Sequence, residues 1–457
     1  PRPGTDVALG LAIAHVWLTD GCYDKEYIAN RTTGFDEWEA YVLGESDGIP
    51  KTPTWAEGEC NIPAREIRAL ATEWGAKTTM LAAGGLGGWG GACRAATGNE
   101  WARTMVALAA MQGMGKRGSN IWSTTLGAPA NTSFVFPGYS EGGISGDLSN
   151  SSAGLRWVYR MFPRGGVTVN PHRASDGQTV PRLRIPEAML HEPLEWRGKG
   201  FCTSAIQSQF HKNEYPAPGY PMVGMYYRYG GSFIGTMTET NRFVTSYQTD
   251  HISFVVNQSI WMEGEAKFAD IVLPACTNFE RWDIGEWAGM AGRGDNTNHR
   301  VIALQKKCIE PLGESKSDYQ IFAELSKRLG VWEIFTDGGK TDLDWVKQMF
   351  HASDLPKVIS WEDFEKKGYY IVPPPVGRKS TPGFRWFAED RRRDTPEAGP
   401  HPADTVGLKG LQTVSGKIEF VASSLKQFEE TGTVDSERPV MGPQYIESWE
   451  GHHTADL

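Results

Sequence analysis

Several patterns that would point directly to a function are missing from this chain of 457 residues. Its six cysteines are scattered and none belongs to a Cys-x-x-Cys pair, which argues against an iron–sulfur cluster or zinc ribbon held by this chain alone. Scattered cysteines in a long chain are typical of reduced thiols, so we expect a cytoplasmic protein. No apolar run approaches the roughly 18 residues that cross a bilayer, so we expect no membrane span.

The chain also lacks an excess of positive charge. Its 46 Lys and Arg are outnumbered by 55 Asp and Glu, for a net charge of −9, which argues against nucleic acid as a partner. The length is sufficient for two or three domains with their own cores. The first residue is not Met and no signal-peptide pattern follows, so we expect an internal piece of a longer protein.

The most distinctive stretch that is present contains six glycines within eight residues. It follows a short apolar run at 78–83 and precedes a helical pattern at 101–111. Strand, glycine turn and helix together direct backbone N–H groups and a helix N-terminus toward an anion. Glycine also leaves the main chain open to a phosphate or a ring. We therefore predict a site for a phosphorylated cofactor, with three candidate contacts: Gly85, Gly87 and Gly88.

Two other interpretations of this stretch are open. Residues 85–90 match the Gly-x-Gly-x-x-Gly pattern of nicotinamide dinucleotide sites, which also require an acidic residue about 20 positions later. Residues 105–112 contain no charge, and Trp89 would be bulky inside a tight turn, so this interpretation is disfavoured. The second alternative is a glycine-rich turn that binds nothing.

The remaining patterns predict an α/β fold of two lobes with mostly parallel sheets covered by helices. Helical patterns cover 6–17, 27–45, 54–74, 236–247 and 316–330, and strand patterns cover 223–229, 252–260 and the end of 265–273. Ligands on parallel sheets lie at the carboxyl ends of the strands. The first of these three strands is followed by further candidate cofactor contacts: Gly230, Gly231 and Ser232.

We divide the chain into four parts by composition and pattern. The expected parts are a first cofactor-binding lobe at 1–135, an irregular substrate loop at 136–181, a second cofactor-binding lobe at 182–345, and a linker at 346–457.

Three motifs in a fixed order resemble the catalytic subunits of the dimethyl sulfoxide reductase family. They are PGTDVAL at 3–9, the glycine-rich run at 84–94 with its continuation at 109–118, and AKFADIVLP at 266–274. The resemblance implies part of a larger multidomain subunit that carries molybdenum on two molybdopterin guanine dinucleotides. It also implies that Asp6 accepts hydrogen bonds from a guanine, with helix capping as the alternative role, and that a small partner subunit carries [4Fe–4S] clusters.

Within this family, three stretches are most similar to a branch that moves a hydroxyl group between trihydroxybenzenes of the pyrogallol and phloroglucinol type. They lie at 228–243, 268–284 and 408–420. The resemblance implies that Trp89 faces the cavity of a small aromatic substrate and that Tyr139 acts on its hydroxyls as an acid or base. A tyrosine suits this role because its ordinary pKa, about 10, is near that of a phenolic substrate.

One part of the substrate pocket departs from that branch. After Trp282 the resemblance leads us to expect a Cys and a Tyr, whereas this chain offers Met290 and Arg293, which changes the expected polarity of the pocket. The resemblance also implies that the molybdenum ligand and an assisting His and Asp lie N-terminal to this chain, and that the linker at 346–457 leads to a C-terminal barrel. Two alternatives stay open: a net oxidoreductase of the same family, such as a resorcinol hydroxylase, and a non-catalytic nucleotide-binding module.

Overall fold

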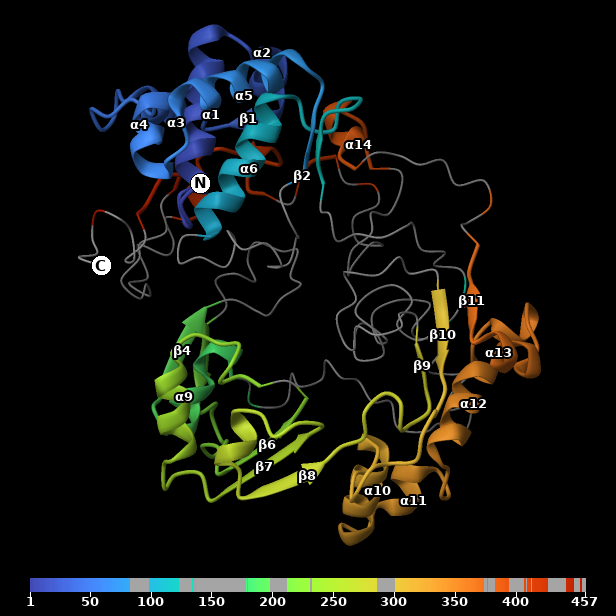
Figure 1. The fold of residues 1–457 in the computed structure, drawn as a ribbon. Helices are drawn as coiled ribbons and strands as arrows, with labels where there is room; N and C mark the ends of the chain where they lie inside the picture. The colour runs from blue at the N-terminus through green and yellow to red at the C-terminus, as the bar shows by residue number, and fades with distance from the viewer. Residues whose placement is uncertain are drawn as a thin grey trace. The chain divides into compact units, whose positions relative to one another are not determined.

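The fold is described from a computed structural model of the chain (Figure 1). The described residues are 1–82, 98–122, 134, 136, 178, 180–197, 212–230, 232–285, 301–373, 376, 383–393, 407, 409–411, 413–425, 441–447 and 453. They form two compact units, the first within Pro1–Leu126 and Lys379–Leu457, the second within Gly127–Gly198 and Lys212–Arg378. Within these ranges, no helix has the length and apolar character that crossing a membrane requires.

The first unit is assembled around helix α1 (Asp6–Asp20), which contacts helices on several sides (Figure 1). Small residues along α1, including Ala8, Gly10 and Ala12, are buried and allow those helices to approach closely. The helix ends at Gly21, whose φ of 71° lies in the left-handed region that favours glycine at a helix C-terminus. Its neighbours are α3 (Phe35–Leu43), α4 (Pro53–Cys60), α5 (Ala64–Ala76) and α6 (Gly98–Met111).

Two of the predicted helical stretches each contain two helices. The stretch 27–45 is divided into α2 (Lys25–Arg31) and α3 at Gly34, which has a φ of 71°. The stretch 54–74 is divided into α4 and α5 near Asn61, which has a φ of 58°. Hydrophobic periodicity continues across both breaks because the two helices of each pair bury their apolar residues in the same unit.

Residues distant in sequence complete the first unit. β1 (Thr32–Thr33) pairs in parallel with β12 (Ile418–Glu419), and β2 (Met80–Ala82) pairs in parallel with β3 (Asn120–Trp122). The remaining elements are α14 (Arg385–Ala388) and the 3₁₀ helix Ser423–Leu425.

Hydrogen bonds fasten the segment 441–447 to the helices of this unit. Trp38 Nε1 donates to the Pro443 carbonyl over 3.0 Å, and the Gln444 N–H donates to Glu100 Oε2 over 3.0 Å. The described parts of 346–457 are therefore folded, although composition indicated a linker there. Buried aromatic side chains such as Phe420 supply the apolar surface for this packing, and weak periodicity did not reveal it.

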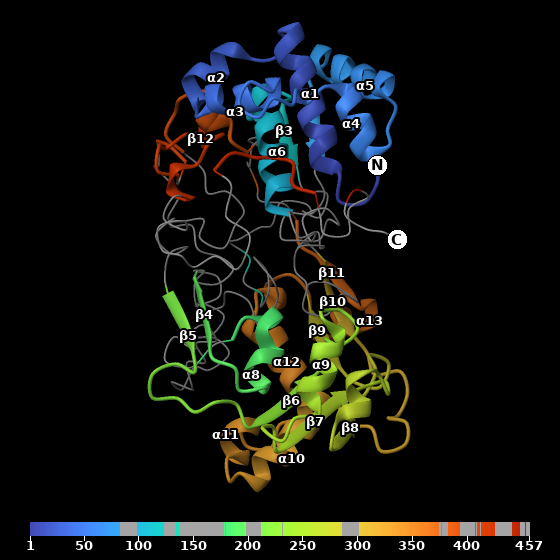
Figure 2. The ribbon, with the colours of Figure 1, turned by 90° about the vertical axis from the view of Figure 1, so that its left-hand side faces the viewer.

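The second unit contains a three-stranded parallel sheet in the order β6-β7-β8 (Figure 2). The strands are β6 (Met225–Tyr229), β7 (Phe254–Ser259) and β8 (Ile271–Pro274), close to the three predicted. α9 (Thr240–Tyr247) connects β6 to β7, and the 3₁₀ helix Glu265–Phe268 connects β7 to β8. The core beside the sheet includes Phe243, Tyr247 and Val255.

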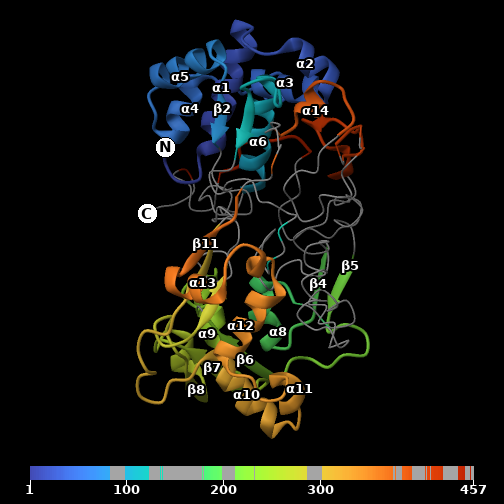
Figure 3. The same cartoon turned by 90° about the vertical axis from the view of Figure 1, so that its right-hand side faces the viewer.

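A second sheet of this unit is antiparallel, in the order β11-β10-β9; Figure 2 labels all three strands and Figure 3 labels the edge strand β11. Phe350, Phe364 and Ile302 form the core that joins this sheet to the helices of the C-terminal part of the unit. The strands are β9 (Asp283–Gly285), β10 (Val301–Gln305) and β11 (Tyr369–Ile371), and the helices are α10 (Asp318–Arg328), α11 (Trp332–Thr336), α12 (Asp342–Ala352), α13 (Trp361–Lys367) and the 3₁₀ helix Leu355–Lys357.

The last pair of strands in this unit is also antiparallel. It consists of β4 (Leu194–Arg197) and β5 (Lys212–Tyr215), which lie near α8 (Ile185–Met189) and the 3₁₀ helix Arg182–Arg184. The prediction of an α/β fold is confirmed, since helices alternate with parallel strands in both units. The two antiparallel sheets are additions that the sequence patterns did not predict.

We predict that Gly10→Val destabilises the first unit. A Cβ atom at residue 10 would lie 2.7 Å from Cγ2 of Thr104 and 3.4 Å from Cε of Met105, so α6 would have to move away from α1. The expected loss in the free energy of unfolding is about 1–3 kcal/mol, measured by urea denaturation. The matched control is Gly58→Val in α4, where no heavy atom lies within 4 Å of the added Cβ. Equal stability of the two variants would contradict close α1–α6 packing.

Candidate functional site

The carboxyl ends of the parallel strands in the second unit carry the predicted glycine turn. β6 ends at Tyr229, and Gly230 follows with a φ of 81°. The Gly230 N–H donates to the Gln258 carbonyl of β7 over 3.3 Å, which fixes the start of the turn. No heavy atom of the described residues lies within 4 Å of the position that a Cβ would take. The described residues therefore leave the Gly230 backbone open to a ligand, and its role as a cofactor contact stays a prediction.

Ser232 continues this turn. Its Oγ accepts a hydrogen bond from the Gly235 N–H over 3.3 Å, and its carbonyl accepts one from Thr236 Oγ1 over 2.6 Å. The hydroxyl that accepts can still donate its own proton, because a serine oxygen carries both functions. The turn is therefore held by local bonds, and no described residue accepts the proton of the Ser232 hydroxyl, which could bind an anionic group.

Asn257 in β7 adds a buried polar group that the sequence analysis did not select. It pairs with Arg228 in the register of β6 and β7, and Arg228 lies two residues before Gly230. Its Nδ2 donates to Glu263 Oε1 over 3.2 Å, whereas its buried Oδ1 has no hydrogen-bond donor among the described residues. Buried acceptors are nearly always paired. Asn257 Oδ1 is therefore a candidate to accept a hydrogen bond from a bound molecule.

The loop after β8 is fixed by the buried carboxylate of Glu280. This group accepts hydrogen bonds from the Thr277 N–H over 2.6 Å, the Thr277 hydroxyl over 2.7 Å and the Leu312 N–H over 2.7 Å. These bonds hold the pKa of the Glu280 carboxyl below its ordinary value, and the bond from the Thr277 hydroxyl contributes most. The third strand of the sheet therefore ends in a rigid loop.

The thiols of the described chain are not arranged for metal chemistry. The four described cysteines form no disulfide with one another and lie at 22, 60, 276 and 308. Burial raises the pKa of the Cys276 thiol, which makes it a poor nucleophile. No group of three or more His, Cys, Asp or Glu in the described ranges could hold a metal ion.

In the first unit, Asp6 is the first residue of α1 and is half-buried. The cap position belongs to Thr5, whose hydroxyl donates to the Arg2 carbonyl over 2.7 Å and forms no bond with the helix. Asp6 has no hydrogen bond or ion pair with another described side chain, so its carboxylate is available at the positive end of the helix. Its predicted contact with a guanine stays a prediction.

The other predicted site residues lie outside the described part of the chain. They are Gly85, Gly87, Gly88, Trp89, Tyr139, Gly231, Met290 and Arg293. The sequence analysis missed three polar residues that the structure buries around the sheet ends: Asn257, Glu265 and Glu280. Asn257 alone carried a local signal, an amide within the apolar strand pattern 252–260.

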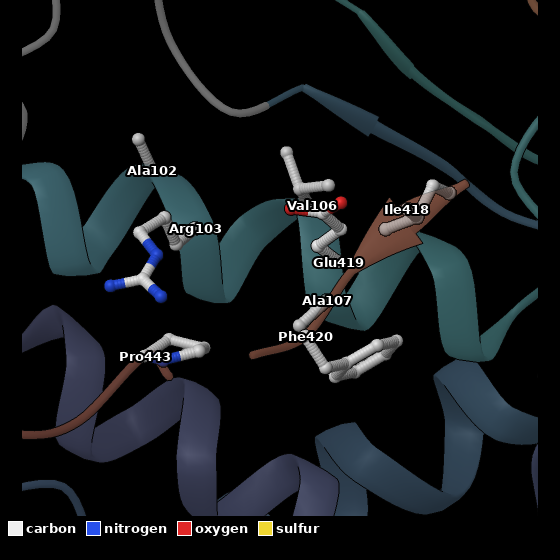
Figure 4. A pocket seen from close by; sticks show the side chains of 8 residues that line it. All are labelled: Ala102, Arg103, Val106, Ala107, Ile418, Glu419, Phe420 and Pro443. Atoms are coloured by element: carbon white, nitrogen blue, oxygen red, sulfur yellow. The ribbon is translucent and has the colours of Figure 1, made fainter. Parts of the chain in front are cut away.

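A pocket of about 210 Å³ lies in the first unit between α6 and the strand β12 (Figure 4). Its lining is mainly apolar, with Val106, Phe420 and Pro443 among the residues that form it. Its two charged residues have other partners, because Arg103 pairs with Glu100 of the same helix and Glu419 accepts from a backbone N–H. The pocket therefore lacks the convergent polar groups that catalysis needs.

The sequence was compared with known proteins. Over 463 residues it is 55% identical to the pyrogallol hydroxytransferase large subunit of Pelobacter acidigallici, an alignment that covers 100% of this chain and 53% of that protein. It is 32% identical over 438 residues to a dimethyl sulfoxide/trimethylamine N-oxide reductase of Cereibacter sphaeroides, covering 93% of this chain and 45% of the reductase. The chain thus spans about half the length of these curated relatives.

A solved structure and a family model complete the comparison. Acetylene hydratase from Pelobacter acetylenicus matches with a TM-score of 0.53 and 20% identity, covering 99% of this chain and 51% of that one, so this likeness concerns the fold alone. A family model described as molybdopterin oxidoreductase matches residues 1–328, which include the predicted glycine-rich stretch and the parallel sheet of the second unit. The chain therefore belongs to the molybdopterin oxidoreductase family.

Proposed function

We propose that the whole protein is a molybdenum-dependent hydroxytransferase that moves a hydroxyl group between trihydroxybenzenes, with pyrogallol and phloroglucinol as the type substrates. The observation that carries this proposal is the 55% identity to the pyrogallol hydroxytransferase large subunit along the entire chain. Pyrogallol and phloroglucinol are isomers, so the conversion involves no net oxidation.

The described residues fit a bound molybdopterin cofactor. The open backbone at Gly230, the available hydroxyl of Ser232 and the unpaired buried acceptor of Asn257 lie around the end of β6. We propose that two molybdopterin guanine dinucleotides bind, one in each lobe, with the molybdenum ligand outside this chain. When bound, the molybdenum centre supplies a reversible acceptor of electron density from the aromatic ring. The contacts that we assign to this chain are Asp6, Gly85, Gly87 and Gly88 in the first lobe, and Gly230, Gly231 and Ser232 in the second.

Within the substrate pocket, we assign two roles to aromatic residues of this chain. Trp89 stacks against the flat ring and excludes water, which strengthens the electrostatic interactions around the substrate. Tyr139 gives and takes a proton at a substrate hydroxyl, because the two groups have similar ordinary pKa values. Met290 and Arg293 line the pocket and set its polarity.

The proposal includes the arrangement of the whole protein. We divide this chain into cofactor-binding lobes at 1–135 and 182–345, a substrate loop at 136–181 and a final segment at 346–457 that leads to a barrel. A relative that is named a large subunit supports a small partner subunit, for which we propose [4Fe–4S] clusters. We propose that the complex is cytoplasmic and acts in the anaerobic degradation of aromatic compounds.

A second candidate function is a net oxidoreductase of the same family, such as a resorcinol hydroxylase. The 32% identity to a dimethyl sulfoxide/trimethylamine N-oxide reductase favours it, since that enzyme is named for a net reduction. Such an enzyme requires an external electron donor or acceptor, whereas the hydroxytransferase does not.

The function is tested with the purified whole protein and pyrogallol under anaerobic conditions. We expect phloroglucinol to form without any electron acceptor, because the two compounds have the same oxidation state, and chromatography measures it. Turnover that depends on an artificial electron acceptor would instead support the oxidoreductase. A protein that contains no pterin would contradict both functions.

We predict that Gly230→Val reduces the pterin content of the whole protein by about tenfold or more, because a branched side chain fills the approach to the backbone. Gly219→Val is the matched control, since its φ of 83° is close to the 81° of Gly230 and both positions face open space. The two variants should therefore share the same backbone strain. Equal pterin content in both, measured by fluorescence after oxidative extraction, would rule out Gly230 as a cofactor contact.

We predict that Tyr139→Phe leaves the pterin content unchanged and lowers kcat by about 10²–10⁴, the usual effect of losing a general acid or base. Steady-state kinetics of the whole protein measure this change, and Tyr369→Phe on the exposed edge strand serves as the control. A Tyr139→Phe variant within about threefold of the wild-type kcat would assign Tyr139 to packing.

A further inference from the structure

The second unit contains a buried carboxylate whose contacts converge on the glycine turn. Glu265 is 1% exposed and begins the 3₁₀ helix between β7 and β8. Its Oε1 accepts a hydrogen bond from the Tyr247 hydroxyl over 2.5 Å, and its Oε2 accepts one from the Phe233 N–H over 2.6 Å. The guanidinium Nε of Arg228 lies 3.8 Å from Oε2.

These three partners belong to the segments that surround the turn. Arg228 lies in β6 just before the turn, Phe233 follows Ser232 directly, and Tyr247 is the last residue of α9. The Arg228 guanidinium also lies over the Phe233 ring, 4.1 Å from its centroid. One carboxylate therefore joins the strand before the turn, the backbone after it and the helix that follows.

The segment that carries this carboxylate also packs directly against the turn. A Cβ atom on Gly264 would lie 3.7 Å from Ser232 Oγ and 3.6 Å from Ile234 Cγ2. Residue 264 therefore lies beside both neighbours of Phe233, with just enough room between them for a Cβ at ordinary van der Waals distance. In a closely packed interior, a displacement of residues 264 and 265 is transmitted to the turn.

In both hydrogen bonds to Glu265, the carboxylate is always the acceptor. Burial, followed by the nearby Tyr226 and Glu265, raises the pKa of the Tyr247 hydroxyl far above its ordinary value, so this hydroxyl stays a donor at physiological pH. The Phe233 N–H can only donate. Glu265 is thus the shared acceptor, and a buried carboxylate with such partners is costly to displace.

We propose that Glu265 is a positioning residue for the cofactor in the second lobe. It holds the Phe233 N–H and thereby sets the position of Ser232, whose hydroxyl would hold a phosphate of the dinucleotide. Glu265 does not touch the cofactor, because its carboxylate is buried beneath the turn. This inference rests on the proposed function, which supplies the dinucleotide.

The test compares three variants of the whole protein. Glu265→Met keeps the length of the side chain and removes both acceptors, Glu265→Gln keeps an oxygen that can accept from the Phe233 N–H, and Tyr247→Phe removes only the other hydrogen bond. We measure the pterin retained after gel filtration and the Tm of each variant.

We expect Glu265→Met to retain about tenfold less pterin, as for the loss of a hydrogen bond to a charged acceptor. Glu265→Gln and Tyr247→Phe should each retain at least about half of the wild-type amount, although Tyr247→Phe lowers the Tm. Two results would distinguish positioning from a general loss of stability. The Glu265→Gln variant would retain pterin, and the amount of pterin retained by the variants would not depend on their Tm.

Two results would overturn the proposal. The first is a Glu265→Met variant that retains as much pterin as the wild type. The second is a loss of pterin that is proportional to the decrease in Tm, in the same ratio for Glu265→Met and Tyr247→Phe. If Glu265→Met does not fold, hydrogen–deuterium exchange of Glu265→Asp decides, because its shorter carboxylate cannot reach both donors: faster exchange confined to residues 230–235 supports positioning, and unchanged exchange there overturns it. A wild-type protein without pterin would overturn the proposed function itself, whereas a loaded wild type with unaffected variants would remove only the role of Glu265.

Discussion

Burial of α1 on most of its surface is the constraint on which the first unit depends. A helix without a polar face must be covered by other elements, and its small residues determine how closely they approach. Gly10 brings α6 into contact, and Ala12 packs in the smaller core that contains residues of α4 and α5. Because α6 follows the glycine-rich stretch directly, the packing of α1 also determines where the predicted cofactor turn is anchored.

The second unit depends on a different constraint, because polar side chains are buried in its parallel sheet and in the 3₁₀ helix between β7 and β8. Asn257, Gln258 and Glu265 are each almost completely buried. Gln258 is paired on both sides, since it accepts from the Tyr227 hydroxyl over 2.6 Å and donates to Asp318 over 2.6 Å. Buried polar networks of this kind are tolerated only where nearly every member is bonded. They specify one arrangement of the loops at the strand ends.

The family assignment and these two units are consistent with each other. The molybdopterin oxidoreductase family model matches residues 1–328, a range that covers the helices around α1 and the parallel sheet. The part of the chain after this range is not a simple extension, because β11 completes a sheet of the second unit and β12 pairs with β1 of the first. Each unit is therefore completed by residues that come late in the sequence.

The sequence by itself determined the α/β class, the three parallel strands of the second unit and the glycine turn after β6. These features depend on local patterns: alternation, β-branched runs and the φ that only glycine adopts easily. Motif order was also sufficient to identify the family. The assignment of Gly230 and Ser232 as cofactor contacts rests on such local signals and that of Asp6 on the resemblance, and all three stay predictions.

Only the tertiary structure decided which polar side chains support the turn and how the late segments are folded. Glu265 looks in sequence like one charge in a solvent-exposed connection, and nothing local indicates that its carboxylate accepts from Tyr247 and Phe233. The same is true of β12, whose partner β1 is nearly 400 residues earlier in the chain, as Thr32 faces Ile418. Contacts of this kind depend on which surfaces meet after folding, and local propensity contains no information about them.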